Sequence, residues 1–457
     1  MTPPWYRAAW ALARPIAGLA ARGDSKLARA VRGRLGGAGA LVAWATAHRE
    51  RGRPLVWMHA ASVGEGRQAE AILRRLRAAR PDWQFVHTFL SPSAERFAAT
   101  LPVAFAGYIP ADTPGDTGRA LDAVRPDLLC FSATDVWPEL VRQASRRGVR
   151  LALVSANLAA ASSRLGTVAR SALGPAYAAL DRVGAIAAAD AARLVALGVR
   201  EDRITVTGDT RHDAAHARAS AVDRTAPHLR ALAVDGDSRP ILVAGSTWPA
   251  DEARLLAAVG RVLGEGTGLR LVLAPHEPTA AHLAGLAESL PLTLGSLVRV
   301  RSLSDLEAQL RGGALRSGTQ PGGALPAGAG WDVCLVDRVG VLADLCAAAA
   351  FAYVGGGFGR SGLHSVIEPA ALGVPVLFGP RWQGSRDAHL LLDAAGGRSV
   401  SDEATLEAAL RHWLNDETAR TAAGAAARAV VDRGQGAAER SVGLLLSLLE
   451  PPAGQRL

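Results

Sequence analysis

Short apolar runs alternate with amphipathic helical stretches along most of the chain. One such stretch, Gln68–Arg80, places Ala69, Ile72 and Leu76 on a single helical face. Apolar runs separated in this way predict parallel sheets with helices covering both faces. In the first half we expect strands at Pro54–His59, Gln84–Phe89, Asp127–Ser132, Arg150–Ser155, Val183–Ala187 and Ile204–Thr207.

The same pattern restarts after a polar, alanine-rich stretch, Asp213–Arg239, that contains no strand candidate. We therefore predict an N-terminal segment (1–50) and two Rossmann-like α/β domains, 51–225 and 226–457, with a cleft between their carboxyl edges, where such folds bind ligands. Gly312–Gly330 is rich in small residues without periodicity and is predicted to be a flexible surface insertion. The second-half strand candidates are Pro240–Ala244, Leu269–Ala274, Val333–Val336, Ala350–Val354 and Pro375–Phe378.

Charge adds a preference for anionic partners. The chain has 51 basic and 42 acidic residues, a formal net charge of +9, which favours an acidic lipid, a nucleic acid or a phosphorylated substrate. The alternative explanation of the positive net charge is that arginine is simply abundant on the protein surface. Nucleic acid is the weakest of these partners, because the aromatic residues do not interleave with a basic stripe. The three cysteines are expected to be buried and unpaired.

The N-terminal segment combines aromatic and basic residues. Trp5, Tyr6, Arg7 and Trp10 lie among apolar residues, and a basic run follows from Arg22 to Arg34. No stretch approaches the roughly 18 to 20 apolar residues of a spanning helix. The segment is expected either to lie on an anionic membrane or to pack on the protein itself, since the same amphipathic pattern serves both.

The first candidate for chemistry follows the first predicted strand. His59 leads through a turn of small residues to Glu65, at the start of the predicted helix. A carboxylate at the carboxyl end of a strand can act as a general base. Acidic residues are also simply favoured in the first turn of a helix, so both roles stay open for Glu65.

Two further candidates follow later strands of the first half. Asp135 is expected to cap a helix that begins near Pro138, and catalysis is the alternative. Arg211 follows the strand ending at Thr207. Its guanidinium can grip a phosphate or carboxylate in two hydrogen bonds, or form an ordinary surface salt bridge.

The second half carries two turns suited to anions. Ser246 and Thr247 precede a helix and make a turn that can accept an anion. A glycine-rich loop, Gly355–Gly359, then leads to His364 and Glu368, which are four residues apart and are predicted to share one helix face. Four glycines between a strand and a helix are hard to explain by packing, so we expect a phosphate site with a carboxylate for ribose hydroxyls. No P-loop spacing and no zinc-ligand set is present.

In their order along the chain these motifs resemble those of the Kdo transferases of lipopolysaccharide synthesis, where Kdo is 3-deoxy-D-manno-octulosonic acid. The family's His-x-x-Ser-Val-Gly-Glu stretch is similar to the run from His59 to Glu65, and the resemblance makes Glu65 the catalytic base. Its Glu-Leu-Trp-Pro resembles the run that begins at Asp135. Its Gly-Asn-Leu-Lys-Phe-Asp resembles the run from Gly208, with Arg211 in place of a lysine that steadies charge in the transition state.

The second-half motifs fit the same family. Its Ser-Thr-His-x-Gly-Glu-Glu is similar to the run from Ser246 to Glu252, and its late Gly-Gly-His-Asn-x-x-Glu-Pro, which binds the cytidine nucleotide, is similar to the run from Gly362 to Pro369. The donor-binding residues that the resemblance implies are Ser246, Thr247, Pro275, His276, Gly340, Gly356, Gly357, His364, Ser365 and Glu368.

Some positions depart from the family pattern. Ala133 stands where the family usually has a further glutamate, and His276 stands where it has a phosphate-binding arginine. Val341 replaces a glutamate, and Ser365 replaces an asparagine. These changes leave the class unchanged. They keep open an enzyme of the same architecture that uses another sugar nucleotide, such as an epimerase, or a non-catalytic homologue that binds sugar or lipid.

The resemblance implies a GT-B glycosyltransferase that moves Kdo from CMP-Kdo to a lipid A precursor by direct displacement. It implies no cofactor and no metal, and Asp112 and Asp116 are spaced too far apart for an Asp-x-Asp metal motif. The expected partners are a nucleotide sugar, a phosphorylated lipid acceptor and an anionic membrane surface. The expected location is the cytoplasmic face of the inner membrane of a Gram-negative-type bacterium.

Overall fold

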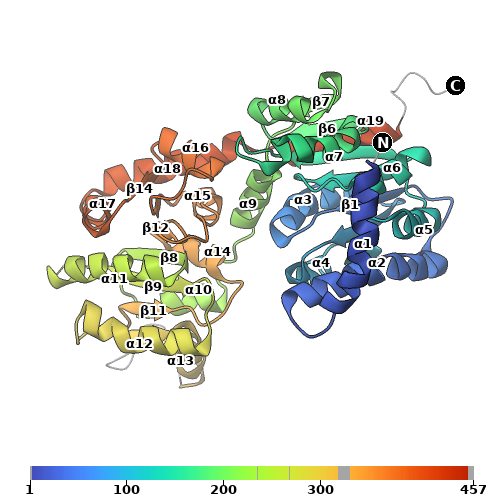
Figure 1. Ribbon diagram of the computed structural model, residues 1–457. Helices are drawn as coiled ribbons and strands as arrows, with labels where there is room; N and C mark the ends of the chain where they lie inside the picture. The colour runs from blue at the N-terminus through green and yellow to red at the C-terminus, as the bar shows by residue number, and fades with distance from the viewer. Residues whose placement is uncertain (1–2, 234, 267, 317–329, 451–457) are drawn as a thin grey trace. The chain divides into compact units, whose positions relative to one another are not determined.

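The computed structural model describes residues 3–233, 235–266, 268–316 and 330–450, which form two α/β units (Figure 1). The first unit takes in the chain up to Ala214 and from Gly434 onward, and the second holds Ala215–Arg433. Within these residues each unit has one parallel sheet of seven strands. The predicted α/β class is confirmed.

The first sheet has the order β3-β2-β1-β4-β5-β6-β7. All six strands predicted for this half are present, and β3 was missed. β1 pairs with β2 on one side and with β4 on the other, so it lies within the sheet, and all five of its residues are buried. The strands are β1 Leu55–His59, β2 Gln84–Phe89, β3 Phe105–Tyr108, β4 Leu128–Ser132, β5 Arg150–Ala156, β6 Arg182–Ala185 and β7 Ile204–Val206.

The second sheet has the order β10-β11-β9-β8-β12-β13-β14. The five predicted strands are present, and β10 and β14 were missed. These two strands, like β3, lie at a sheet edge and have three or four residues. An edge strand pairs on one side only, so it lacks the long apolar run of a buried strand. The strands are β8 Ile241–Thr247, β9 Arg270–Pro275, β10 Val300–Ser302, β11 Val333–Leu335, β12 Phe351–Val354, β13 Val376–Phe378 and β14 Gly397–Ser399.

Helices cover both faces of the first sheet (Figure 1). Alternate strand residues point to opposite faces, so Trp57 packs in one core cluster with α2 and α5, whereas Met58 packs in another with α3 and α19. The helices of this unit are α1 Pro4–Ala20, α2 Lys26–His48, α3 Val63–Ala79, α4 Glu95–Ala98, α5 Pro114–Val124, α6 Pro138–Arg146, α7 Thr167–Ala178, α8 Ala188–Leu197 and α19 Ala437–Leu449.

The second sheet is covered in the same way. Leu242 packs in one cluster with α11, α12 and α17, and its neighbour Val243 packs in another with α10 and α13. The predicted insertion within 312–330 falls largely on residues 317–329, which lie outside the described residues. The helices are α10 Pro227–Leu232, α11 Pro249–Gly264, α12 Ala280–Leu294, α13 Leu303–Arg316, α14 Leu342–Leu345, α15 Ile367–Ala371, α16 Arg386–Asp393, α17 Glu403–Asn415 and α18 Glu417–Arg433.

The unit boundaries differ from the predicted ranges at two places. The first crossing falls at Ala214, inside α9 (Thr210–Ser220), and not near residue 225. The second crossing follows Arg433, so α19 belongs to the first unit and not to the predicted range 226–457. Asp213 on α9 accepts hydrogen bonds from the backbone N–H groups of Gly436 at 2.8 Å and Ala438 at 2.9 Å, and thereby caps α19.

The predicted N-terminal segment 1–50 is part of the first unit. α2 buries Leu41 and Trp44 in the core. α1 contacts the unit through polar groups: the Tyr6 hydroxyl donates to Asp112 at 2.8 Å, and Arg7 Nε donates to Glu139 at 3.0 Å. Within the described residues, no helix has the length and apolar character needed to cross a bilayer.

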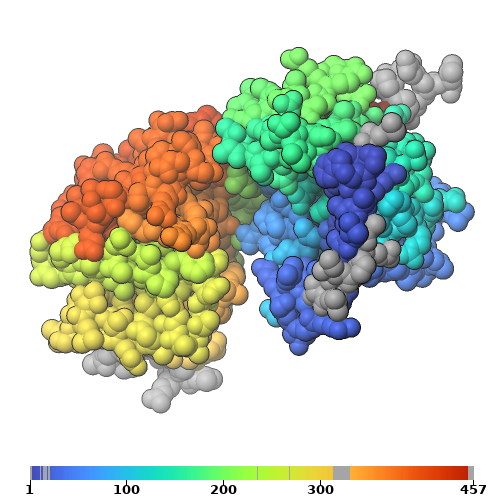
Figure 2. Space-filling view, viewed as in Figure 1, coloured from blue at the N-terminus to red at the C-terminus, as the bar shows by residue number. Residues whose placement is uncertain are grey.

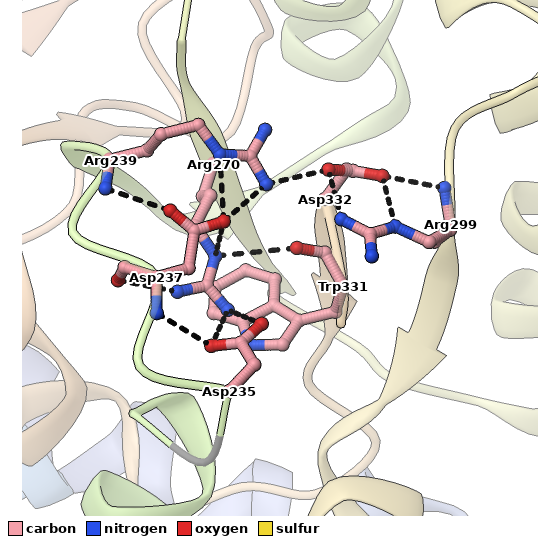
Figure 3. Close-up of polar contacts among 7 residues, drawn as sticks. All are labelled: Asp235, Asp237, Arg239, Arg270, Arg299, Trp331 and Asp332. Atoms are coloured by element: carbon pink, nitrogen blue, oxygen red, sulfur yellow. Dashed lines mark hydrogen bonds and ion pairs between the residues drawn. The ribbon is translucent and has the colours of Figure 1, made fainter. Parts of the chain in front are cut away.

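A network of arginines and aspartates, here called the Arg270 cluster, joins the amino ends of β8 to β11 (Figure 3). Arg270 is completely buried, with its guanidinium 3.7 Å from the centre of the Trp331 ring. It donates to both carboxylate oxygens of Asp235, at 3.0 and 2.8 Å. The members are Asp235, Asp237, Arg239, Arg270, Arg299, Trp331 and Asp332. The cluster fixes the segment that leads into β8, because Arg270 also donates to the Asp237 carbonyl.

Candidate active site

Glu65 lies in the first turn of α3, directly after β1. Its backbone N–H donates to Ser62 Oγ at 3.4 Å, and Glu65 Oε2 accepts from the Ser62 N–H at 3.0 Å, which completes a capping box. The helix-end role considered for Glu65 is therefore present. It leaves one carboxylate oxygen outside the capping box.

The electrostatics of Glu65 also suit a base. Burial raises the pKa of the Glu65 carboxyl above its usual range, and the charge of Asp135 raises it further. Asp135 Oδ1 in turn accepts from Arg164 at 2.7 Å. A carboxylate whose pKa is raised holds a proton more strongly once it has taken one, which favours general-base chemistry. Two predicted site residues, Glu65 and Asp135, thus lie close enough to interact.

The expectation that Asp135 caps α6 is wrong. The N-cap residue is Trp137, and it makes no side-chain cap. The carboxylate of Asp112 takes that role, accepting from the N–H groups of Glu139 at 3.0 Å and Leu140 at 2.8 Å. Asp112 comes from the loop before α5, so local spacing along the sequence could not reveal it. Asp135 is left to interact with Arg164 and Glu65.

His59, at the end of β1, is held in one neutral form. Its Nδ1 lies 2.9 Å from the Thr88 carbonyl, and its Nε2 accepts from Trp137 Nε1 at 3.2 Å. Nδ1 therefore carries the proton. Burial, with a smaller contribution from His87, lowers the pKa of His59 to about 3. This histidine orients Trp137 and is unsuited to proton transfer near neutral pH.

Arg211 lies in the first turn of α9, at the same edge of the first sheet. It grips Asp209 with two hydrogen bonds, from Nε at 2.9 Å and Nη2 at 2.5 Å. Asp209 is buried and also accepts from Gln68 of α3 at 3.3 Å. The sequence analysis considered an anion-binding role and a salt bridge for Arg211, and the structure contains the salt bridge, to Asp209. Through Asp209 and Gln68 it connects Arg211 to the helix that carries Glu65.

In the second unit the predicted donor residues gather at one edge of the sheet. Thr247, Pro275 and Gly356 lie at or just after the carboxyl ends of β8, β9 and β12, and β9, β8 and β12 are neighbours in the sheet. Gly340 is exposed between β11 and α14, beside the same edge. Ser246 has a φ of 53°, a left-handed conformation that non-glycine residues adopt rarely and often at functional sites.

Three rings stack at this edge. The ring centres of Trp248 and His276 are 4.7 Å apart, and those of His276 and His364 are 4.4 Å apart. Trp248 Nε1 donates to His364 Nε2 at 3.0 Å. Burial and the neighbouring His276 lower the pKa of His364, so it stays neutral and accepts this bond. His276 is exposed.

Close packing accounts for two of the glycines in the loop Gly355–Gly359, whereas the sequence analysis expected that packing could not explain them. A Cβ on Gly355 would lie 2.3 Å from the Ser246 carbonyl oxygen, and one on Gly357 would lie 2.6 Å from the backbone nitrogen of Gly379. Two of the loop N–H groups are also occupied: those of Gly356 and Phe358 donate to Asp251 at 2.9 and 3.2 Å. The hypothesis that the loop amides as a set bind phosphate does not survive these contacts.

The prediction that His364 and Glu368 share a helix face is wrong. α15 begins at Ile367 and has five residues, so His364 lies in the loop before it. The His364 N–H donates to the Gly355 carbonyl at 3.1 Å, which folds the loop back on itself. Ser365 is exposed beside it, and Glu368 lies in the first turn of α15. The carboxylate and the imidazole thus belong to different segments.

Comparison with known proteins gives one family. A family model described as 3-deoxy-D-manno-octulosonic-acid transferase (kdotransferase) matches residues 31–214. A 3-deoxy-D-manno-octulosonic acid transferase of Bordetella pertussis is 32% identical over 397 residues, which cover 85% of this chain and 86% of the relative. One of Haemophilus influenzae is 27% identical, with 86% and 87% covered.

Solved structures agree on the fold. A UDP-GlcNAc 2-epimerase from Neisseria meningitidis matches with a TM-score of 0.60 and 11% identity, covering 86% of this chain and all of that one. A glycosyltransferase from Rickettsia africae matches with a TM-score of 0.54 and 10% identity, with 87% and 99% covered. At such low identity the likeness concerns the fold alone, and the predicted class of two Rossmann-like domains of the GT-B type is confirmed.

Proposed function

Because the chain belongs to the 3-deoxy-D-manno-octulosonic acid transferase family and is a glycosyltransferase of lipopolysaccharide synthesis, we propose that it transfers Kdo from CMP-Kdo to a phosphorylated lipid A precursor. The observation that carries the proposal is Glu65, a half-buried carboxylate with a raised pKa at the carboxyl edge of the first sheet. It lies within the residues that the family model matches.

In the proposed reaction Glu65 accepts the proton of an acceptor hydroxyl as its oxygen attacks the anomeric carbon of Kdo. The new carbon–oxygen bond forms as the bond from that carbon to the phosphate oxygen breaks, and CMP leaves. Arg211 is proposed to steady the developing negative charge. No metal is proposed, since cationic side chains of the protein would neutralise the phosphate.

The donor is proposed to bind at the carboxyl edge of the second sheet. The stack of Trp248, His276 and His364 offers flat ring faces and an exposed imidazole there. His276 in place of an arginine also motivates a second candidate, a transferase of this fold with another sugar nucleotide. The two candidates are therefore distinguished by comparing the binding of nucleotides that differ only in the base.

Two measurements test the donor. Wild-type protein with CMP-Kdo and a tetraacylated lipid A precursor is expected to give a Kdo-bearing product by mass spectrometry. Calorimetric titration is expected to show CMP binding at least about tenfold tighter than UMP, as one good base contact would give. No product together with tighter UMP binding would favour the second candidate. No product and no nucleotide binding would favour a non-catalytic homologue.

We further propose that α1 lies on an anionic membrane, at the cytoplasmic face of the inner membrane. Tyr6, Arg7 and Trp10 turn toward the first unit, where the guanidinium of Arg34 lies 4.9 Å from the Trp10 ring. The opposite face of the helix is exposed to solvent and apolar. α1 is the dark-blue segment on the front of the first unit in Figure 2. The described residues of that exposed face include Trp5, Ala8, Ala9 and Leu12.

Leu12→Glu is expected to lower binding to anionic vesicles by about tenfold, because burying a leucine side chain contributes about 1.5–3 kcal/mol. Leu12 is 74% exposed, so the fold should tolerate the change. The matched control is Leu292→Glu on α12, at a leucine that is 88% exposed. Vesicle flotation measures both variants. Equal binding by wild type and Leu12→Glu would contradict the membrane role of α1.

A further inference from the structure

A buried carboxylate that the sequence analysis did not select organises the edge of the second sheet. Asp251 lies in the first turn of α11 and is completely buried. Its Oδ2 accepts from the Trp248 N–H at 3.0 Å, which caps the helix. Because a buried charge is costly unless fully hydrogen-bonded, the other donors to this carboxylate matter.

Those donors come from β12 and the glycine loop. The Tyr353 hydroxyl donates to Asp251 Oδ1 at 2.9 Å, and the Phe358 N–H donates to the same oxygen at 3.2 Å. The Gly356 N–H donates to Oδ2 at 2.9 Å. Each carboxylate oxygen therefore accepts two hydrogen bonds, and all four donors are uncharged groups. Asp251 joins the start of α11 to two backbone positions of the loop.

This junction controls where two rings of the stack lie. Trp248 is the residue just before α11, and its N–H is held by Asp251. His364 closes the glycine loop through its bond to the Gly355 carbonyl, and its ring accepts from the Trp248 indole. The loop and the helix start are thus fixed twice, once by the carboxylate and once by the ring contact. Loss of the carboxylate would release one of these two connections.

We propose that Asp251 is a positioning residue for the nucleotide site: it contacts no substrate and fixes the glycine loop against the start of α11, so that Trp248 and His364 are aligned before the donor binds. This inference rests on the proposed function for the identity of the ligand. Pre-organisation of this kind lowers the cost of binding, because the loop does not have to be ordered by the ligand.

The test is Asp251→Asn. The amide has one oxygen, so in either orientation two of the four donors face an NH₂ group. Hydrogen–deuterium exchange of a peptide spanning residues 354–362 is expected to speed up by about tenfold or more in the free variant, because one of the two loop amides, that of Phe358 or that of Gly356, loses its acceptor in either orientation. The matched control is Glu252→Gln, a change at the next residue. Glu252 is also buried but bonds to Thr247 and His282 and not to the loop.

A positioning role has a second signature in binding. CMP affinity and the KM for the donor are expected to weaken by about tenfold or more in Asp251→Asn, whereas the KM for the lipid acceptor stays within about twofold. A merely structural role would speed amide exchange throughout the second unit and lower the thermal midpoint, without this difference between the two KM values. Equal loop exchange in Asp251→Asn and Glu252→Gln would overturn the inference.

The positioning role of Asp251 and the proposed CMP-Kdo donor can be tested independently of each other. The exchange experiment needs no ligand, so it judges the positioning role even if wild type binds no CMP. If exchange rises in the loop while wild type shows neither CMP binding nor transfer, the proposed donor is wrong and the positioning role of Asp251 stands. If Asp251→Asn does not fold, Tyr353→Phe removes one donor to the same carboxylate and is expected to give a smaller rise in loop exchange. An unchanged rate in that variant would then count against the proposal.

Discussion

Glu65→Gln is expected to lower the rate of Kdo transfer by about 10²–10⁴-fold, the usual contribution of one positioned base. Glutamine can still accept the Ser62 N–H, so the capping box survives and the protein should stay folded. The variant therefore separates the two roles that Glu65 has in this structure, helix capping and proton acceptance. Single-turnover transfer with saturating donor and acceptor measures the effect on the chemical step.

Ser62→Ala is the matched control, since it removes the hydroxyl that accepts the Glu65 N–H and leaves the carboxylate. It is expected to cost about 1 kcal/mol of stability and to keep most of the activity. In wild type the rate should fall on acidification at a pH above the usual range of a glutamate, because burial and Asp135 raise the pKa of Glu65. A wild-type rate in Glu65→Gln would exclude this residue as the base.

Arg270→Ala is expected to destabilise the protein by about 3–5 kcal/mol, the range for breaking a buried ion pair. Arg270 is completely buried, donates to both oxygens of Asp235 and lies flat against Trp331. Its removal leaves the Asp235 charge without its partner and opens a cavity beside the indole. Urea unfolding followed by circular dichroism measures the change.

Arg299→Ala tests whether the large loss of stability expected for Arg270→Ala comes from the burial of Arg270. Arg299 belongs to the same Arg270 cluster and donates to Asp332 at 2.9 and 3.0 Å, but its side chain is 45% exposed. An exposed ion pair contributes about 0–1 kcal/mol, so the expected loss is small. Similar losses in the two variants would mean that the cluster acts as a unit and that burial of Arg270 is not decisive.

The interior strands were predictable because burial on both faces imposes a continuous apolar run. β1, with five buried residues, is the clearest example. The edge strand β10 carries Arg301 and Ser302 in a run of three, so no such pattern marks it. Likewise α19 has an apolar face whose partner the sequence does not specify, and it packs on α3, β5 and β6 of the first unit.

The site was predictable to the extent that it follows strand ends. Glu65 and Thr247 lie where the strand pattern and the family motifs indicated. Asp112 and Asp251 were missed because their partners lie far away in the sequence: Asp251 bonds to Gly356 across 105 residues. The signal available for Asp251 was an acidic residue in a helix first turn, which is common to many helices and does not single out this one.

The place of α19 has a consequence for synthesis on the ribosome. Val442 and Leu445 help to complete the core on one face of the first sheet, yet they follow the entire second unit in the chain. While that unit is being translated, α19 has not yet been made. The face of the first sheet on which α19 packs therefore exposes apolar surface. Domains commonly fold in order as they emerge, whereas here the unit begun first is finished last, so the nascent chain would offer a binding surface to chaperones until α19 docks.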